Sequence, residues 1–271
     1  SANLGWGLTS ASIDDTDLYI ERLNPETSNQ YQSANSFKPF IKSQSIITIK
    51  DQPSITLDLL QTDNGPILSD SNLNLQSITP NGHVVSVAST LLSPRDTSIE
   101  AMINIMRSQS VKQAIEASKI YIAPGQNLIL ADKKEIAMRT IGSLPKRHSK
   151  HQSRGRMPTR GWIAFNRWQG VYDQSVNPIF LNPTEGILGN TNNKIINKAF
   201  PEHVSYEWGD TERIQRWTRL MQSRSSHTRD SFIEIQLDNI SPTARTLLPL
   251  IGAELWFKSD VNNLENSMTN K

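Results

Sequence analysis

Apolar and polar residues alternate with a period of two along much of the first half of the chain. The alternation is clearest between residues 41 and 68, where it includes Ile55-Thr56-Leu57-Asp58-Leu59. It recurs in three later stretches, at 84–88, 127–131 and 136–141. Because successive side chains of a strand point to opposite faces, this period predicts β-strands, with Gly65-Pro66 as a turn.

A helical spacing interrupts the strands near residue 100. Thr97 and Glu100 have the separation of a capping box, in which each side chain bonds the backbone of the other residue. The apolar residues that follow recur three and four positions apart, at Ile99, Met102, Ile103 and Met106. We therefore expect a helix that starts at Thr97 and packs through this apolar face.

The last quarter of the chain also has a helical pattern. Residues 211–221 place Ile214, Trp217, Leu220 and Met221 on one face. Thr228 is expected to cap a second helix, and Ser241-Pro242 to start a third, since proline is tolerated at the first helical position. Strands first and helices late favour an α+β fold over a doubly wound parallel sheet.

Composition narrows the function classes. The 271 residues contain 28 Lys and Arg against 26 Asp and Glu, so the formal charge of +2 gives no reason to expect a nucleic-acid or anionic-membrane partner. The absence of cysteine excludes disulfides and thiolate metal sites. No apolar run is as long as a membrane span, so we expect no membrane partner.

One stretch departs from this even charge balance. Residues 146–170 are basic and poor in apolar residues, and residues 145–160 are expected to form an exposed loop. Basic residues interleaved with aromatic ones over 146–167 could bind an anionic ligand, as in a non-catalytic binding or scaffold module. The basic residues are Lys146, Arg147, Lys150, Arg154, Arg156, Arg160 and Arg167.

An acidic pair lies near the start of the chain. Asp14 and Asp17 are spaced so that both carboxylates can turn toward one hard cation, with the carbonyl of Thr16 between them. An acidic turn with solvated carboxylates has the same spacing, and spacing alone favours that simpler interpretation.

The residues around this pair resemble the catalytic chain of the penicillin amidases, amide hydrolases that use an N-terminal serine. The likeness starts at Gly5-Trp6-Gly7-Leu8-Thr9-Ser10 and continues to Glu21. Further matches follow in the family's order, at 127–132, 142–147, 186–193, 208–213 and 235–244. The resemblance implies that the chain is a central fragment of that catalytic (beta) chain.

The resemblance implies three catalytic positions. Asn192 matches the asparagine whose side-chain amide donates to the oxyanion that forms when the serine attacks the acyl carbon. Ser10 matches the residue whose backbone N–H is the second donor, and Arg213 matches an arginine that helps to hold the asparagine. One preorganised donor of this kind contributes about 3 kcal/mol to transition-state stabilisation.

The resemblance also implies a calcium site. Asp14, Thr16 and Asp17 match two carboxylate ligands and an intervening backbone ligand, and Pro145 matches a further backbone ligand. Glu202 is the candidate for one more carboxylate. The remaining family ligand belongs to the other, smaller subunit, so this chain would supply an incomplete site.

Further expectations concern the organisation of the protein. The resemblance implies part of a four-layer αββα arrangement. Within it, residues 1–145 would be mainly strands with a helical insertion, 146–170 the basic loop, and 171–271 the asparagine loop and helices. The family's nucleophile is a serine followed by asparagine well upstream of the Gly-Trp-Gly strand, which Ser1-Ala2 does not match. The isolated chain is therefore expected to be inactive.

The resemblance implies partners and a location as well. The expected partners are the rest of the catalytic chain, a smaller alpha chain and a small-molecule amide. The acyl group of that amide could be the side chain of a β-lactam or that of an N-acyl-homoserine lactone. The location implied is periplasmic or secreted, and no nucleic acid is expected.

Overall fold

The computed structural model describes residues 3–69, 73–209 and 211–256, with side chains as far as residue 252. The chain folds into two compact units, Ser1–Trp208 and Gly209–Lys271. The strands of the first unit are β1 (Gly5–Ser10), β2 (Thr16–Arg22), β3 (Gln30–Ser33), β4 (Ser36–Pro39), β5 (Ile41–Ile47), β6 (Ile55–Thr62), β7 (Gly65–Pro66), β8 (His83–Ser89), β9 (Gln126–Ala131), β10 (Ile136–Ile141), β11 (Thr159–Arg160) and β12 (Ile179–Leu181). Its α-helices are α1 (Ser98–Arg107) and α2 (Val111–Ala117), and those of the second unit are α3 (Glu212–Gln222), α4 (Arg229–Gln236) and α5 (Pro242–Trp256).

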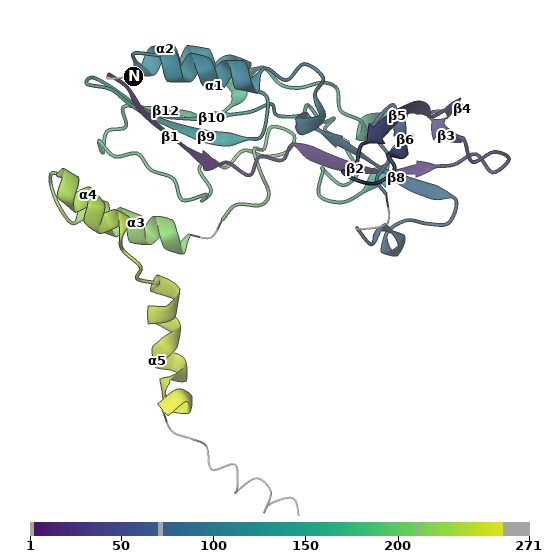
Figure 1. The fold of residues 1–271 in the computed structure, drawn as a ribbon. Helices are drawn as coiled ribbons and strands as arrows, with labels where there is room; N and C mark the ends of the chain where they lie inside the picture. The colour runs from purple at the N-terminus through teal and green to yellow at the C-terminus, as the bar shows by residue number, and fades with distance from the viewer. Residues whose placement is uncertain (1–2, 70–72, 210, 257–271) are drawn as a thin grey trace, which may run out of the picture. The chain divides into compact units, whose positions relative to one another are not determined.

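The main sheet of the first unit has the strand order β1-β9-β10-β12, with every neighbouring pair antiparallel. Figure 1 shows α1 and α2 together over one face of this sheet. Alternate side chains of the strands point toward the helices and bury their apolar surface there. The buried cluster consists of Leu4, Ala101, Ile105, Val111, Ala114, Tyr121, Leu128, Leu130, Ala137 and Ile141.

The helix predicted near residue 100 is present, but it packs through a different face. Ala101 and Ile105 are fully buried, whereas Ile99 is 75% exposed and Met106 is 50% exposed. Residues four apart lie one above the other on a helix, so Ala101 and Ile105 form one ridge against the sheet. The choice of face follows from where the sheet lies, which the apolar spacing alone does not show.

The predicted capping box at the start of this helix is wrong. The Thr97 side chain makes no capping hydrogen bond. Its hydroxyl donates instead to the carbonyl of Ile120, and the carboxylate of Asp96 accepts from the backbone N–H of Ser98 at 2.9 Å. The aspartate one residue earlier therefore satisfies an N–H group that the helix itself leaves unpaired.

A second sheet continues from the first strand of the main sheet. After a short bend, β2 becomes the central strand of the order β11-β2-β8. Asp17, Tyr19 and Glu21 alternate along β2, share one face and are buried. Buried carboxylates need hydrogen-bond donors, and Glu21 accepts from the hydroxyls of Thr62 and Ser86. This sheet therefore places Asp17 inside the first unit.

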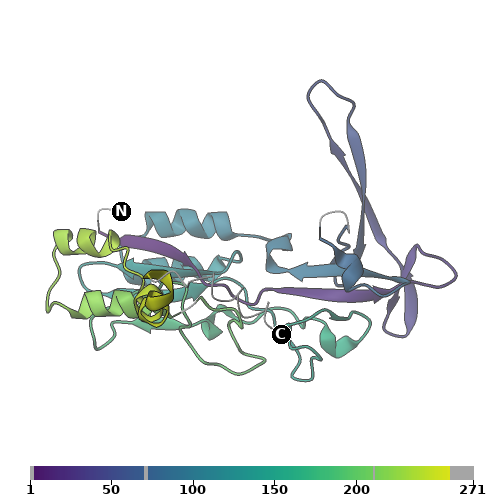
Figure 2. The same ribbon diagram turned by 90° about the horizontal axis from the view of Figure 1, so that it is seen from below.

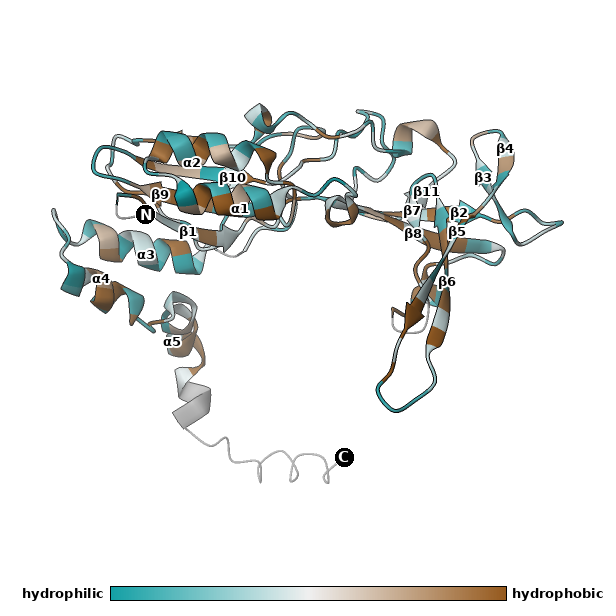
Figure 3. Cartoon of the chain, turned by 45° about the horizontal axis from the view of Figure 1, so that its top comes forward, coloured by the Kyte–Doolittle hydropathy of each residue, from teal (hydrophilic) through white to brown (hydrophobic). Residues whose placement is uncertain are grey.

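The strands predicted between residues 41 and 68 form a long hairpin, β5–β6, which Figure 2 shows projecting from the rest of the first unit. In their antiparallel register, alternate residues share a face. The apolar side chains of that face are between 42% and 57% exposed. They are Ile41, Ile47, Ile55, Leu57 and Leu59. Figure 3 shows brown, hydrophobic stretches in the ribbon of β5 and β6.

The basic loop is less exposed than its composition predicts. Arg147 is 3% exposed and His151 is 4% exposed. The prediction that this loop is exposed is therefore wrong for Arg147 and His151. The remainder of the loop contains the short strand β11, which pairs in parallel with β2.

An irregular segment connects the basic loop to the second unit. The irregular segment 171–208 belongs to the first unit. Its Val204 is buried in a second apolar cluster with Ala11, Ile13 and Leu144. This cluster fixes the bend between β1 and β2 against the loop that follows β10.

The second unit contains the three helices predicted for the last quarter. Thr228 caps α4 as expected and forms a reciprocal capping box with Ser231. Pro242 is the first residue of α5, where its missing N–H costs no helical hydrogen bond. Within this unit, Arg216 of α3 makes two hydrogen bonds to Asp238, at 3.0 and 2.6 Å.

The mixture of antiparallel sheets and helices is consistent with the predicted α+β class. Among the residues that the structure describes, no helix is both long and apolar enough to cross a membrane. Ser1 and the polar tail at 258–271 lie outside the described residues.

Candidate functional site

Asn192 and Ser10, predicted to act together, lie in contact. The side-chain amide nitrogen of Asn192 donates to the main-chain carbonyl oxygen of Ser10 at 2.8 Å. Asn192 has a φ of 65°, in the left-handed region, which asparagine tolerates better than most residues. The turn conformation and the hydrogen bond together aim the amide at the end of β1.

The register of β1 shows which way the backbone of Ser10 points. Ala11 donates to the carbonyl of Gly125 at 3.2 Å, and Ser10 is opposite Gln126. Because backbone N–H groups alternate sides along a strand, the N–H and C=O of Ser10 both point away from β9. β1 is an edge strand of its sheet, so the Ser10 N–H faces the same open side as the Asn192 amide.

Asn190 fixes this arrangement, although the sequence did not single it out. Its side-chain oxygen accepts from the backbone N–H of Asn192 at 2.8 Å and from the Thr9 hydroxyl at 2.8 Å. It also accepts from the side chain of the fully buried Asn127 at 3.2 Å. The available signal was the Asn190-Thr191-Asn192 spacing, because asparagine side chains often bond their own backbone two residues on.

Arg213 lies in the second unit. It is the second residue of α3, whose N-cap is Thr211, and it is exposed. The structure describes the second unit by itself, so the expected role of Arg213 in holding Asn192 stays a prediction.

The predicted acidic pair contacts a buried arginine, with Asp17 buried and Asp14 half-buried. The guanidinium of Arg147 makes two hydrogen bonds to Asp17, from Nε to Oδ2 at 2.9 Å and from Nη2 to Oδ1 at 3.1 Å. Nη2 also donates to the backbone carbonyl of Asp14 at 3.1 Å and lies 3.3 Å from its Oδ1. Burial lowers the pKa of Arg147, but hydrogen bonding and charge from Asp17, together with Asp14, outweigh burial and raise this pKa above its usual value.

Other buried groups surround this ion cluster. The Trp168 indole N–H donates to Asp17, and the Arg147 guanidinium lies 5.8 Å from the centre of the Trp168 ring. Nε2 of His203 lies 2.6 Å from Oδ2 of Asp14, and a carboxylate can only accept there. Burial lowers the pKa of His151, which lies 3.9 Å from Asp17, and the charge of Asp17 opposes this shift.

This arrangement does not fit the calcium ion that the resemblance implies. Ca²⁺ takes about six to eight oxygen ligands, whereas a guanidinium lies between these two carboxylates. In the part of the chain that the structure describes, no three Asp, Glu, His or Cys side chains are grouped as metal ligands. The fit therefore fails on the donors present, because the position between the two aspartates already contains a positive charge.

The other three residues that were expected to bind calcium have different positions. Thr16 is the first residue of β2, and its hydroxyl donates to Ser89 at 3.0 Å. Pro145 is buried two residues before Arg147, so the resemblance indicated the right loop. Glu202 is exposed, and it is the next residue, His203, that contacts Asp14. No sequence pattern indicated that Arg147 and His203 contact the acidic pair, because their partners are 130 and 189 residues away.

Three other arginines of the basic loop also make contacts within the first unit. Arg167 donates to the carbonyl of Gly161 at 2.7 Å. Arg154 lies over the ring of Phe200, and Arg156 lies over the ring of Tyr206. Arginines held in this way are less available to an external anion, which weakens the interpretation of this loop as an anion-binding surface.

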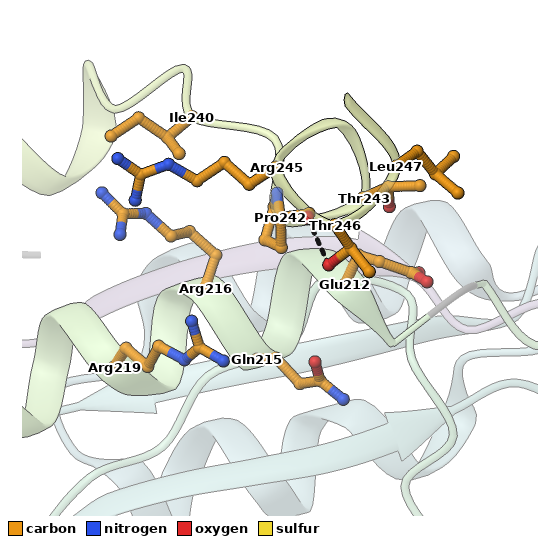
Figure 4. A pocket seen from close by; sticks show the side chains of 10 residues that line it. All are labelled: Glu212, Gln215, Arg216, Arg219, Ile240, Pro242, Thr243, Arg245, Thr246 and Leu247. Atoms are coloured by element: carbon orange, nitrogen blue, oxygen red, sulfur yellow. Dashed lines mark hydrogen bonds between the residues drawn. The ribbon is translucent and has the colours of Figure 1, made fainter. Parts of the chain in front are cut away.

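The second unit contains a hollow of its own, between α3 and α5 (Figure 4). Its volume is about 300 Å³, and Arg216, Arg219 and Arg245 line it together with Glu212. The sequence analysis did not predict this basic hollow. Arg216 is already neutralised by Asp238, so the lining has less positive character than its three arginines suggest.

Comparison with known proteins places this geometry in context. The family model described as "Penicillin amidase" matches residues 1–269. An acyl-homoserine lactone acylase QuiP of Pseudomonas aeruginosa is 27% identical over 247 residues, which cover 89% of this chain and 29% of that protein. Penicillin G acylase of Escherichia coli is 24% identical over 256 residues, covering 92% of this chain and 29% of that protein.

A solved structure has a similar fold. The thermostable penicillin G acylase of Alcaligenes faecalis superposes with a TM-score of 0.76 at 20% identity. The superposition covers 96% of this chain and 46% of that chain. The chain therefore spans less than a third of the length of the two relatives above and less than half of this structural neighbour.

Proposed function

The chain belongs to the penicillin amidase family, and we propose that it forms the oxyanion-stabilising part of an enzyme that hydrolyses linear amides. The observation that supports this proposal is the 2.8 Å contact between the Asn192 amide and the carbonyl of Ser10. It holds a side-chain N–H donor beside a main-chain N–H donor at an open strand edge. Preorganised donors of this kind stabilise the negative charge that develops during acyl transfer.

In the proposed reaction, a serine outside this chain attacks the carbonyl carbon of the amide. The C=O bond becomes a C–O⁻ bond, and the oxyanion accepts hydrogen bonds from Asn192 Nδ2 and the Ser10 N–H. Collapse of this intermediate breaks the C–N bond, releases the amine with a proton and leaves an acyl-serine. Water then attacks the acyl-serine, the same donors stabilise the second oxyanion, and the acid and the free serine are formed.

The proton transfers are assigned to the serine itself, by resemblance to the family. There the nucleophile is N-terminal, and its α-amino group is the base, because a pKa of about 8 suits proton transfer near neutral pH. We further propose that Arg213 holds Asn192 in the assembled protein, within a four-layer αββα arrangement.

We propose that the substrate is an N-acyl-homoserine lactone or a β-lactam with an amide-linked acyl side chain. One relative is named for acyl-homoserine lactones and the other for penicillin G, so both substrate classes are proposed. The rest of the catalytic chain and a smaller alpha chain are the proposed partners, and the proposed location is periplasmic or secreted. The alternative of an anion-binding module is less favoured, because the arginines of the basic loop contact their own unit.

The test is hydrolysis of model amides, measured as release of phenylacetate or of a fatty acid. We expect turnover from the protein that contains this chain together with its serine-bearing partner segment, and none from the 271-residue chain alone. Robust turnover by the chain alone would contradict the proposal that the nucleophilic serine lies outside it. No turnover by the assembled protein on either acyl class would contradict the proposed reaction.

A further inference from the structure

We infer that the Arg147 guanidinium is a built-in cation that joins Asp14 and Asp17 at the position a calcium ion would need, so that this junction requires no metal. The inference concerns how the first unit is held together and does not rest on amide hydrolysis. It follows from the identity of the positive group between the two carboxylates.

The contacts of Arg147 are those of a cation shared by two acids. Both terminal oxygens of Asp17 accept from the guanidinium, at 2.9 and 3.1 Å. Asp14 contributes its backbone carbonyl and one carboxylate oxygen, at 3.1 and 3.3 Å. A planar guanidinium matches carboxylate geometry with two parallel hydrogen bonds, which is the arrangement that Arg147 makes with Asp17.

The cluster is closed to solvent on the Asp17 side, whereas the Asp14 side chain is 14% exposed and lines a hollow of about 400 Å³. The side chains of Arg147 and Asp17 are 1% and 2% exposed. Gly155 lies directly over them, because a Cβ at this position would be 3.0 Å from both Arg147 Nε and Asp17 Oδ1. Trp168 covers another side, with its N–H on Asp17. The guanidinium occupies the position between the two carboxylates, so a metal ion could bind there only in its place.

The junction connects the bend between β1 and β2 to two distant parts of the first unit. Asp14 lies in the bend that follows β1, Asp17 lies in β2, and Arg147 lies in the loop after β10. His203, from the segment near the end of the unit, holds the far oxygen of Asp14 at 2.6 Å. The guanidinium therefore joins both ends of the β1–β2 bend to the rest of the unit, as a shared metal ion would do.

The first experiment measures the melting temperature of the 271-residue chain in millimolar calcium and in excess chelator. We expect the two values to agree within about 1 °C, since a metal that does not bind the native state cannot stabilise it. A second measurement adds terbium, a luminescent calcium substitute, and excites tryptophan. Trp168 touches Asp17, so terbium at this site would emit, and we expect no such emission from the wild-type chain.

The decisive variant is Arg147→Met, which keeps an unbranched apolar stem and removes the guanidinium with its charge. In chelator it should lower the melting temperature by about 10 °C, because it leaves the two carboxylates uncompensated. Calcium should recover a measurable part of that loss, and tryptophan-sensitised terbium emission should appear. The matched control is Arg139→Met. Arg139 is also buried but donates to the main-chain carbonyl of Gln174, so calcium should not recover its loss.

If Arg147→Met does not fold in chelator, the double variant Arg147→Met with Asp17→Asn removes one charge of each sign. It should fold without calcium and bind no terbium. The inference would be overturned by a wild-type melting temperature that rises with calcium and falls with chelator. It would equally be overturned if calcium failed to stabilise Arg147→Met, or stabilised Arg139→Met to the same extent.

Discussion

The side-chain amide of Asn192 bonds the main-chain carbonyl of Ser10 at 2.8 Å, although the two residues are 182 positions apart in the sequence. The contact fixes the direction of the amide and indicates the direction of the Ser10 N–H. Two donors from distant parts of the chain thereby face one open strand edge, and this relationship leads to the first three predictions.

Removing the Asn192 amide should reduce kcat in the assembled enzyme by about 10²–10³-fold, with a smaller change in KM, because the oxyanion develops only during the reaction. Asn192→Gly is the informative variant, since glycine adopts the φ of 65° without strain. Asn197→Ala, a nearby exposed asparagine bonded to Lys194, is the matched control and should retain its activity. Wild-type kcat in Asn192→Gly would rule out the proposed donor.

Asn190 should act as a positioning residue. Asn190→Ala removes the oxygen that accepts from Thr9, Asn127 and the Asn192 backbone, so Asn192 loses its fixed place. We expect kcat to fall by about 10–100-fold, since misplacing a catalytic group by about 1 Å has effects of this size. Asn190→Asp keeps the accepting oxygens and should restore most of the activity. Equal losses in both variants would contradict a role that depends on this oxygen.

The main-chain donor can be tested with proline. Ser10→Pro removes the N–H that faces the open edge of β1, and proline is tolerated on edge strands when its nitrogen faces outward. We expect kcat to fall by about 100-fold, and Ser10→Ala to retain activity because the side chain is not the donor. Leu8→Pro provides the control, since Leu8 has the same orientation in the register. An equal activity loss in Leu8→Pro would point to damage of the strand.

The stability contributed by Asp132 should disappear in acid. Its carboxylate accepts from the backbone N–H groups of Val111, Lys134 and Glu135, which lower its pKa below the usual 3.8. A group whose pKa is lower when folded stabilises the protein above its unfolded pKa and loses that effect as the pH falls through the folded pKa. Asp132→Asn should therefore be less stable than wild type at pH 7.

The measurement for Asp132→Asn is the urea midpoint from neutral pH down to pH 3. The difference in urea midpoint between Asp132→Asn and wild type should become smaller as the pH falls below about 4. The exposed Asp51→Asn is the comparison for a simple change of surface charge. A gap that stays constant across the whole range would show that the hydrogen bonds do not depend on ionisation.

Much of the secondary structure follows from local pattern. The alternation at 41–68 and 127–141 became strands because successive side chains of a strand point to opposite faces, and Thr228 capped its helix because the cap is a local hydrogen bond. Local pattern failed where a neighbour decided the outcome. α1 buries Ala101 and Ile105 instead of Ile99 and Met106, because the sheet lies on that side of the helix.

The sequence by itself determined the family, the strands and helices with a clear period, and the match of Asn192 and Ser10 to one site, since these rest on local periodicity and on ordered motifs. The tertiary structure alone decided how the Asp14–Asp17 pair is neutralised. An ion pair depends on which side chain comes within about 3–4 Å after folding, and no local pattern links Arg147 to acids 130 residues away. The same reason hid Asn190 and His203, whose roles come from contacts that the chain makes only once the first unit has closed.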